Sequence, residues 1–363
     1  MEMPPFTNLF VKRGTKLSRL GKVKAHKVVA DAFQYKYVVA GRPKAGKTSL
    51  VHGIVKEKYD NDLSKLLLIA FEKGYNALDG IHADDINEWS DFTELVEELV
   101  ESKDEVSYKV LAFDTVDVMG KMATDYVLKV QSRKDNKRYT AINDLAYGKG
   151  YDLLEREIGE QITKLDKAGY SLIFITHDKD KQFETREGLK YDKTTLSLGG
   201  RVRDLILNMV DFIVFIELSK ELVKGVATDK RYIYFRGDSG LEAGSRFRHV
   251  PNRIEYGYKE FIDTVENAIL SEYGGDVKEV EKAKKEQNKE KEEKANEYVN
   301  SVKNAKTPNE LIEEISELIT ELPKSVKAEC AKYFQENLGD MDYRKSEDEE
   351  GLAKALEFVK NKA

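Results

Sequence analysis

Short apolar runs separated by amphipathic segments dominate residues 31–272. Between the first four runs, segments such as 91–100 and 151–168 repeat apolar positions at helical spacing. Strands that are joined through helices form parallel sheets covered on both faces. The pattern therefore predicts an α/β fold with a mostly parallel sheet between helices. The apolar runs occupy residues 37–40, 66–71, 110–113, 172–176, 212–218 and 232–235.

The last two apolar runs lie close together, with little helical pattern between them. Connections that short join neighbouring antiparallel strands, whereas parallel strands need a longer crossover. We therefore expect the sheet to end in an antiparallel extension, which continues through residues 254–256.

The composition changes after residue 272. Residues 276–305 contain no Gly or Pro and few large apolar side chains, which predicts an exposed, charged helix. Capping boxes then begin at Thr307, which Pro308 follows at the first helical position, and at Ser346. We expect the apolar stripes behind them to form a core of their own rather than a partner groove. The predicted parts are a basic N-terminal arm (1–30), the core (31–272), a charged helical linker (273–306) and a small all-helical C-terminal module (307–363).

Composition and charge exclude several classes of protein. With 40% hydrophobic residues and a net charge of −6 over 363 residues, the chain can form a core but is not a basic nucleic-acid coat. Any nucleic-acid contact must therefore come from local patches. The lone Cys330 excludes an internal disulfide framework and is typical of a reducing cytoplasm. No apolar stretch reaches the length of a membrane span, so we expect no membrane partner.

The octapeptide GRPKAGKT matches the phosphate-binding loop GxxxxGK[ST]. A predicted strand precedes it and a helical pattern at 49–59 follows, which is the context that the motif requires. Its glycines let backbone N–H groups turn toward phosphate oxygens, and the helix N-terminus attracts the anion. Lys47 is expected to reach the β- and γ-phosphates and Thr48 to hold Mg²⁺. The predicted nucleotide-binding residues are Gly41, Arg42, Pro43, Lys44, Ala45, Gly46, Lys47, Thr48 and Ser49.

Polar residues follow three of the neighbouring predicted strands. Asp114 ends one strand in the Walker B pattern, and we expect it to hold the Mg²⁺ shell with Thr48. Glu72 ends a second strand and is the candidate that orients or deprotonates the attacking water. Thr176 and His177 end a third strand and are candidate sensors of the γ-phosphate. The carboxyl ends of parallel strands share one edge of a sheet, so these side chains should meet at the P-loop.

Two polar segments combine cations with aromatic residues. Residues 178–198 mix charges of both signs with Phe183 and Tyr191, and a second basic cluster precedes Tyr147. Single-stranded DNA is bound by cations that contact phosphates and by rings that stack on bases. The acidic residues of the first segment argue against a permanently basic patch, so each segment is a DNA contact or a solvated loop. The candidate DNA contacts are Arg133, Lys134, Lys137, Arg138, Lys179, Lys181, Arg186 and Lys190.

Together these motifs resemble the RecA-like recombinase core and, more narrowly, the AAA-domain ATPases of the Sak type that tailed bacteriophages encode. The resemblance covers residues 35–265. It implies a RecA fold, ATP and Mg²⁺ as cofactors, a homo-oligomeric ring or filament, and a location in the bacterial host cytoplasm. It also implies single-strand annealing or strand exchange beside a phage single-strand-binding protein. It rests on GRPKAGKT, LLLIAFEKG, VLAFDTVD, AYGKGYD, FITHDKDK, LSLGGRVRDLILNMVDFIVFIEL and RYIYFRGDSGLEAGSRF.

The resemblance also implies residue roles. Lys47 and Thr48 match the Walker A ligands, Asp114 the Walker B acid and Glu72 the catalytic base. Thr176 and His177 match the switch at the γ-phosphate. Two other functions stay open: a helicase or loader on the same core, and an ATP-gated protein switch that acts through the C-terminal helices without DNA. RecA-like assemblies also complete the nucleotide site with a cation from a neighbouring subunit, for which the candidates are Arg236, Arg246 and Arg248.

Overall fold

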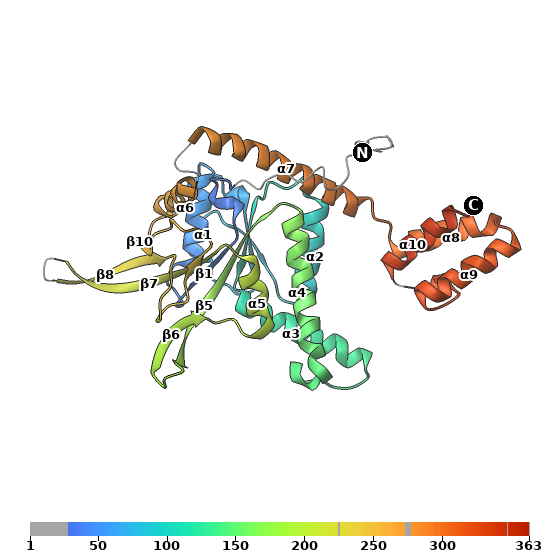
Figure 1. Cartoon of the computed structure of the whole chain (residues 1–363), viewed down its shortest axis with the longest axis horizontal. Helices are drawn as coiled ribbons and strands as arrows, with labels where there is room; N and C mark the ends of the chain where they lie inside the picture. The colour runs from blue at the N-terminus through green and yellow to red at the C-terminus, as the bar shows by residue number, and fades with distance from the viewer. Residues whose placement is uncertain (1–27, 224–225, 273–276, 347, 363) are drawn as a thin grey trace, which may run out of the picture. The chain divides into compact units, whose positions relative to one another are not determined.

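The computed structural model of the chain describes residues 28–223, 226–272, 277–346 and 348–362 (Figure 1). The predicted basic arm lies almost wholly outside these residues. A large sheet forms the centre of the N-terminal part of the chain. Its strands are β1 (Tyr37–Gly41), β2 (Leu66–Ala70), β3 (His82–Asp85), β4 (Val110–Asp114), β5 (Ser171–Glu184), β6 (Lys190–Leu196), β7 (Phe212–Val223), β8 (Val226–Tyr234), β9 (Gly244–Ser245) and β10 (Arg253–Glu255).

The strand order is β10-β8-β7-β1-β5-β4-β2-β3. The strands from β3 to β7 in this order pair in parallel, and β7, β8 and β10 pair antiparallel. Strand β5 therefore separates β1, which leads into the P-loop, from β4, which ends at Asp114. The α/β class, the mostly parallel sheet and the antiparallel extension are confirmed.

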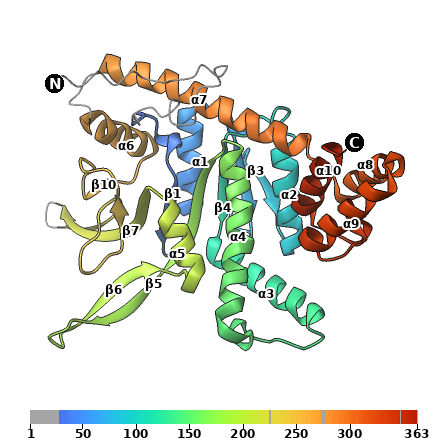
Figure 2. The same ribbon diagram turned by 45° about the vertical axis from the view of Figure 1, so that its right-hand side comes forward.

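Helices cover both faces of this sheet because its strands are apolar on both sides. One face packs against helices α1 and α6, with Val39, Ile175 and Val214 among the buried strand residues. On the opposite face Phe113 stacks on Phe174, with ring centroids 5.0 Å apart. Figure 2 shows α4 and α5 in front of the sheet. The helices are α1 (Lys47–Lys58), α2 (Trp89–Glu101), α3 (Val116–Lys134), α4 (Lys149–Lys167), α5 (Gly200–Met209), α6 (Tyr258–Glu272), α7 (Val277–Lys303), α8 (Pro308–Glu321), α9 (Lys324–Leu338) and α10 (Glu349–Lys360).

The polar segment 178–198 is not the loop that its composition suggested. Strand β5 continues beyond the sheet to Glu184 and pairs antiparallel with β6, which forms a two-stranded ribbon at residues 178–196. Both figures show this ribbon extending past the end of the sheet, as the far end of α3 also does (Figures 1 and 2). Most of its residues are exposed or half-buried, so its strands lack the apolar runs by which buried strands are recognised.

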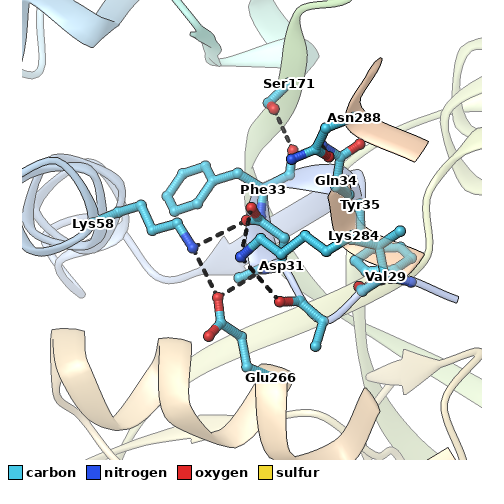
Figure 3. A network of polar contacts seen from close by, with 12 residues as sticks. Val29, Asp31, Phe33, Gln34, Tyr35, Lys58, Ser171, Glu266, Lys284 and Asn288 are labelled. Atoms are coloured by element: carbon cyan, nitrogen blue, oxygen red, sulfur yellow. Dashed lines mark hydrogen bonds and ion pairs between the residues drawn. The ribbon is translucent and has the colours of Figure 1, made fainter. Parts of the chain in front are cut away.

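The first half of α7 packs on the core through a charged network (Figure 3). Lys284 lies 3.2 Å from the Asp31 carboxylate, and Lys58 bridges Asp31 (3.1 Å) and Glu266 (2.8 Å). Burial by itself would raise the pKa of Asp31, but the two ammonium groups hold it below its ordinary value. The predicted linker therefore does not begin where the core ends, because residues up to Glu292 belong to the same compact unit as the sheet.

The second compact unit contains Thr93–Val106 and Glu293–Ala363. Its apolar stripes form a core of their own, as predicted, around Phe334, Cys330 and Leu352. Thr307 caps α8 with the predicted box, in which the Glu310 carboxylate accepts from the Thr307 N–H at 2.8 Å. The capping box predicted at Ser346 is wrong. The next residue but one, Asp348, caps α10, because its carboxylate accepts from the Gly351 N–H at 3.1 Å.

Candidate functional site

The P-loop joins β1 to α1 and has the backbone that its glycines allow. Gly41 and Gly46 have φ angles of 154° and 98°, in the region that favours glycine. A Cβ on Gly41 would lie 2.6 Å from the carbonyl oxygen of Ile216, and a Cβ on Gly46 would lie 3.0 Å from Nη1 of Arg231. Neither position therefore accepts a side chain, and the loop backbone stays open toward a phosphate group.

The three residues predicted to act on nucleotide and metal lie together. Lys47 is 6% exposed, and its ammonium donates to the carbonyl oxygens of Gly41 (3.0 Å) and Arg42 (3.1 Å). Burial lowers the pKa of Lys47, although Asp114 and other nearby carboxylates oppose this effect. The Thr48 hydroxyl donates to Oδ2 of Asp114 at 2.7 Å. Thr48 and Asp114, which are far apart in the sequence, thus place a hydroxyl and a carboxylate in contact beside the loop.

Burial also raises the pKa of Asp114, to about 6, against the opposing effects of the Thr48 hydrogen bond and the Lys47 charge. A carboxylate that is costly to ionise in the folded protein gains from a divalent cation, because the cation replaces the lost solvation. The described residues contain no cluster of three or more His, Cys, Asp or Glu side chains that could hold a metal alone. Hydroxyl and carboxylate oxygens fit Mg²⁺, which is commonly bound by one or two carboxylates together with substrate phosphates.

Glu72 and His177 lie at the same edge of the sheet. The N–H of Glu72 donates to the carbonyl oxygen of Asp114 at 3.1 Å, which fixes Glu72 beside the end of β4. Nε2 of His177 is 3.7 Å from Oε1 of Glu72. Thr176 is fully buried, and its hydroxyl lies 3.4 Å from the Asp117 carboxylate. The structure therefore brings together all the residues at strand ends that the sequence singled out.

Three residues near this site were missed by the sequence analysis. Asp117, in the first turn of α3, lies 3.1 Å from Nδ1 of His177. The Tyr256 hydroxyl donates to the carbonyl oxygen of Gly46 at 2.8 Å, and the Arg231 guanidinium lies over the Tyr256 ring at 4.9 Å. Asp117 is part of the VLAFDTVD motif, so its spacing from Asp114 was a usable signal. Arg231 and Tyr256 carry no local signal, because the antiparallel strands bring them to the loop.

The ribbon separates its charges by face. Directly opposite residues in antiparallel strands share a face, and the face alternates along each strand. The pairs Lys179–Thr195, Lys181–Lys193 and Phe183–Tyr191 therefore lie on one side, which we call the basic-aromatic face. The other side, the acidic face, carries the pairs Asp178–Leu196, Asp180–Thr194, Gln182–Asp192 and Glu184–Lys190.

The aromatic pair on the basic-aromatic face is ordered. The rings of Phe183 and Tyr191 are stacked, with centroids 5.9 Å apart, and both side chains are half-buried. The Lys181 ammonium lies over the Phe183 ring at 5.3 Å. The candidate contacts Lys179 and Lys181 belong to this face, whereas Lys190 lies on the acidic face and Arg186 in the turn. The acidic residues of the paired strands are thus turned to the other side, and Glu187 lies in the turn.

The acidic face contacts the P-loop. Arg42, the second residue of the loop motif, lies 2.7 Å from the Asp180 carboxylate and 3.4 Å from that of Asp178. The Asp178 side chain is 3% exposed, so this pair is partly shielded from solvent. The ribbon is therefore joined to the nucleotide loop by an ion pair.

The second basic cluster occupies the end of α3 and the turn after it. Arg133 and Lys134 form the last residues of the helix, and Lys137 and Arg138 follow; all are exposed. The Lys137 ammonium lies 5.0 Å from the centre of the Tyr139 ring.

The arginines proposed for a neighbouring subunit's site have different surroundings. Arg236 donates to the carbonyl oxygen of Val250 at 2.8 Å, and Arg246 pairs with Asp211 at 3.4 Å. Arg248 is exposed, and its side chain has no hydrogen bond or ion pair with any described residue. Within the described part of the chain, Arg248 is therefore the member of this set whose side chain has no polar contact.

No helix in the described part of the chain combines the length and the apolar character needed to cross a membrane.

Known proteins resemble part of the chain. It is 31% identical over 171 residues to the SPbeta prophage-derived uncharacterized protein YorG of Bacillus subtilis (strain 168), which covers 45% of this chain and 49% of that protein. The chain thus spans about half the length of this curated relative. A solved KaiC-like protein from Pyrococcus horikoshii OT3 aligns with a TM-score of 0.30 and 10% identity, over 61% of this chain and 89% of that one. The family described as "AAA domain" matches residues 34–247, more than half of the chain. The chain therefore belongs to this AAA-domain family and is a P-loop NTPase.

Proposed function

We propose that the protein is a Mg²⁺-dependent ATPase of phage type that binds single-stranded DNA and acts in annealing or strand exchange. The observation that carries the DNA part of this proposal is the sorting of charges on the ribbon. Three lysines and two stacked rings share one face, and no acidic residue pairs among them.

This face has the two components that single strands require. Cations follow the phosphate backbone, and each base that stacks on an aromatic ring contributes about 1–3 kcal/mol. The net charge of −6 does not oppose such binding, because the acidic residues of the paired strands lie on the other face of the ribbon. Tyr147 is fully exposed in the segment after the second basic cluster and offers another ring. Arg133, Lys134, Lys137 and Arg138 would then contact the backbone near it.

The nucleotide half of the proposal assigns one role to each residue of the site. The P-loop amides and Lys47 would hold the β- and γ-phosphates, and Thr48 with Asp114 would hold Mg²⁺, which neutralises charge on the phosphates. Glu72 would accept a proton from the attacking water, whose oxygen bonds to the γ-phosphorus as the bond to the ADP oxygen breaks. His177 would respond to the γ-phosphate from the neighbouring strand.

Arg42 gives this site a route to the ribbon. Its ion pairs with Asp178 and Asp180 connect the phosphate loop to the strands that carry the basic-aromatic face. A loop that tightens on phosphate would therefore change the restraint on the ribbon. We expect DNA binding and ATP turnover to influence each other by this route.

The assembly is also part of the proposal. The exposed Arg248 is suited to reach the nucleotide site of a neighbouring subunit, in a ring or a filament. A phage single-strand-binding protein would present the DNA. Both statements follow the resemblance to RecA-like ATPases.

The test measures ATP hydrolysis by the purified protein with and without single-stranded DNA, with Lys47→Ala as the control for nucleotide turnover. A matched pair of variants then examines the ribbon. Lys181→Ala removes a cation from the basic-aromatic face, and Lys190→Ala removes one from the acidic face. We expect Lys181→Ala alone to weaken DNA binding and to reduce the slope of log affinity against log salt by about 0.7.

Other results would change the assignment. Equal effects of the two variants would remove the ribbon face as the DNA site. Hydrolysis that DNA does not stimulate, together with undetectable DNA binding, would favour an ATP-gated protein switch. Strand unwinding instead of annealing would favour a helicase or loader.

A further inference from the structure

Asp117 has no role in the functional assignments above, although it lies at the centre of a polar chain beside the site. Its Oδ2 is 3.1 Å from Nδ1 of His177, and its Oδ1 is 3.4 Å from the hydroxyl of the buried Thr176. The Nε2 atom on the other side of the same imidazole ring is 3.7 Å from Oε1 of Glu72. A carboxylate, an imidazole and a second carboxylate thus form a line that ends at the candidate base.

The exposure of these groups increases along the line. The Asp117 side chain is 12% exposed, that of His177 is 24% and that of Glu72 is 38%. Thr176 and His177, neighbours on β5, contact the buried Asp117 carboxylate. Glu72 lies at the edge of the sheet where the P-loop is found. Such an arrangement connects a buried carboxylate to a partly exposed one through the imidazole ring.

The surroundings of Asp117 favour the ionised form of its carboxylate. Burial by itself would raise the pKa of Asp117, but the hydrogen bond from His177 contributes to holding it below its ordinary value. A carboxylate that accepts from Nδ1–H fixes the tautomer and the plane of the ring. In the imidazolium form, which carries a proton on each ring nitrogen, Nε2–H is then directed toward the Glu72 carboxylate and can donate to it.

We propose that Asp117 is a positioning residue for ATP hydrolysis, which orients His177 so that His177 restrains the carboxylate of Glu72 at the nucleotide. This inference rests on the proposed ATPase function. Asp117 itself touches neither the P-loop nor the atoms that react. We therefore expect its main effect on the reaction to pass through His177, its shortest side-chain contact.

A purely structural role for Asp117 makes a different prediction. An acidic residue in the first turn of a helix stabilises that helix by its favourable interaction with the helix dipole. Asp117 lies in the first turn of α3, so its removal could simply loosen the helix. A loss of this kind would not depend on whether residue 177 is histidine.

The experiment is a double-mutant cycle on kcat, with Asp117→Ala, His177→Ala and both together in the full chain. We expect Asp117→Ala to lower kcat by about 10- to 100-fold, since misplacement of a catalytic group by about 1 Å has effects of this size. ATP affinity, measured with a fluorescent ATP analogue, should change by less than about twofold. The double variant should be no slower than His177→Ala alone, because coupled residues are not additive.

Two further variants separate the loss of the hydrogen bond to His177 from a loosening of α3. Asp117→Asn keeps an oxygen that can accept from Nδ1–H, so it should recover most of the activity that Asp117→Ala loses. Asp117→Ser keeps a polar side chain in the first turn of α3 but is too short to reach the ring. If Asp117→Ala does not fold, Asp117→Ser takes its place, with the same expected loss of kcat.

The outcomes separate this inference from the function on which it rests. Wild-type turnover no higher than that of Lys47→Ala would remove the ATPase proposal and this inference with it. Wild-type turnover with unchanged kcat in Asp117→Ala would overturn the inference alone. A double variant in which the two losses multiply would also overturn it, because Asp117 would then act independently of His177.

Discussion

Replacement of Asp114 by Asn should stabilise the folded protein while it removes the metal site. Asp114 is 2% exposed, and burial raises its pKa from an ordinary 3.8 to about 6. At about 1.36 kcal/mol for each pKa unit, that difference amounts to roughly 3 kcal/mol of unfolding free energy. Asn keeps the shape and an acceptor for the Thr48 hydroxyl, but it has no charge to desolvate.

The raised pKa of Asp114 determines the pH range in which this carboxylate lowers the free energy of unfolding. Between the unfolded value of 3.8 and the folded value of about 6, the native protein binds the proton more tightly than the unfolded chain does. The contribution of Asp114 to unfolding free energy therefore falls as pH rises through this window, and its cost is fully present above it. Asp114→Asn should match the wild-type protein near pH 4 and exceed its stability by roughly 3 kcal/mol at pH 8.

Urea unfolding without nucleotide or Mg²⁺ measures this difference, with the fluorescence of Trp89 as the signal. Trp89 is the only tryptophan of the sequence, is 2% exposed, and belongs to the same compact unit as Asp114. Asp192→Asn, the same substitution at an exposed position, is the control and should change stability by less than about 0.5 kcal/mol. Mg²⁺ and ATP should then stabilise the wild-type protein but not Asp114→Asn. If Asp114→Asn has no advantage at pH 8, or keeps the same advantage near pH 4, the reasoning about burial of this carboxylate is wrong.

Three other substitutions follow from the contacts. Glu72→Gln should bind ATP with affinity within about twofold of wild type but lower kcat by about 10²- to 10⁴-fold; single-turnover hydrolysis measures this, and an unchanged rate would remove Glu72 as the base. Tyr256→Phe loses the hydrogen bond to the Gly46 carbonyl oxygen, so ATP affinity should fall by about the equivalent of 1 kcal/mol, measured by titration with a fluorescent analogue; equal affinity would show that the hydroxyl does not support the loop. Phe334→Ala should destabilise the C-terminal helical unit by about 3–5 kcal/mol in thermal unfolding followed by circular dichroism, without change in ATP affinity; a loss of affinity would contradict the placement of the whole nucleotide site in the other unit.

The central strands were predictable because of how they are buried. Strands of a parallel sheet that is covered on both faces read as continuous apolar runs, and β1, β2 and β4 match the predicted runs to within a residue at each end. The edge strand β3, with sequence HADD, and the exposed strand β6 have no such run, so the pattern could not indicate them. The sequence pattern also could not indicate that the boundary between the two compact units lies inside α7. The first half of this helix belongs to the core through contacts such as that of Lys284 with Asp31.

The sequence by itself determined the phosphate loop and the residues that end the parallel strands. GRPKAGKT is a local motif, and parallel topology places Asp114, Glu72 and His177 at one edge without further information. Tertiary structure alone decided which charges of the ribbon share a face, because the register of two antiparallel strands assigns each side chain to a side. It also decided that Arg231 and Tyr256 reach Gly46 and that Asp117 reaches His177. These contacts depend on the packing of one element against another, and no local pattern of residues encodes them.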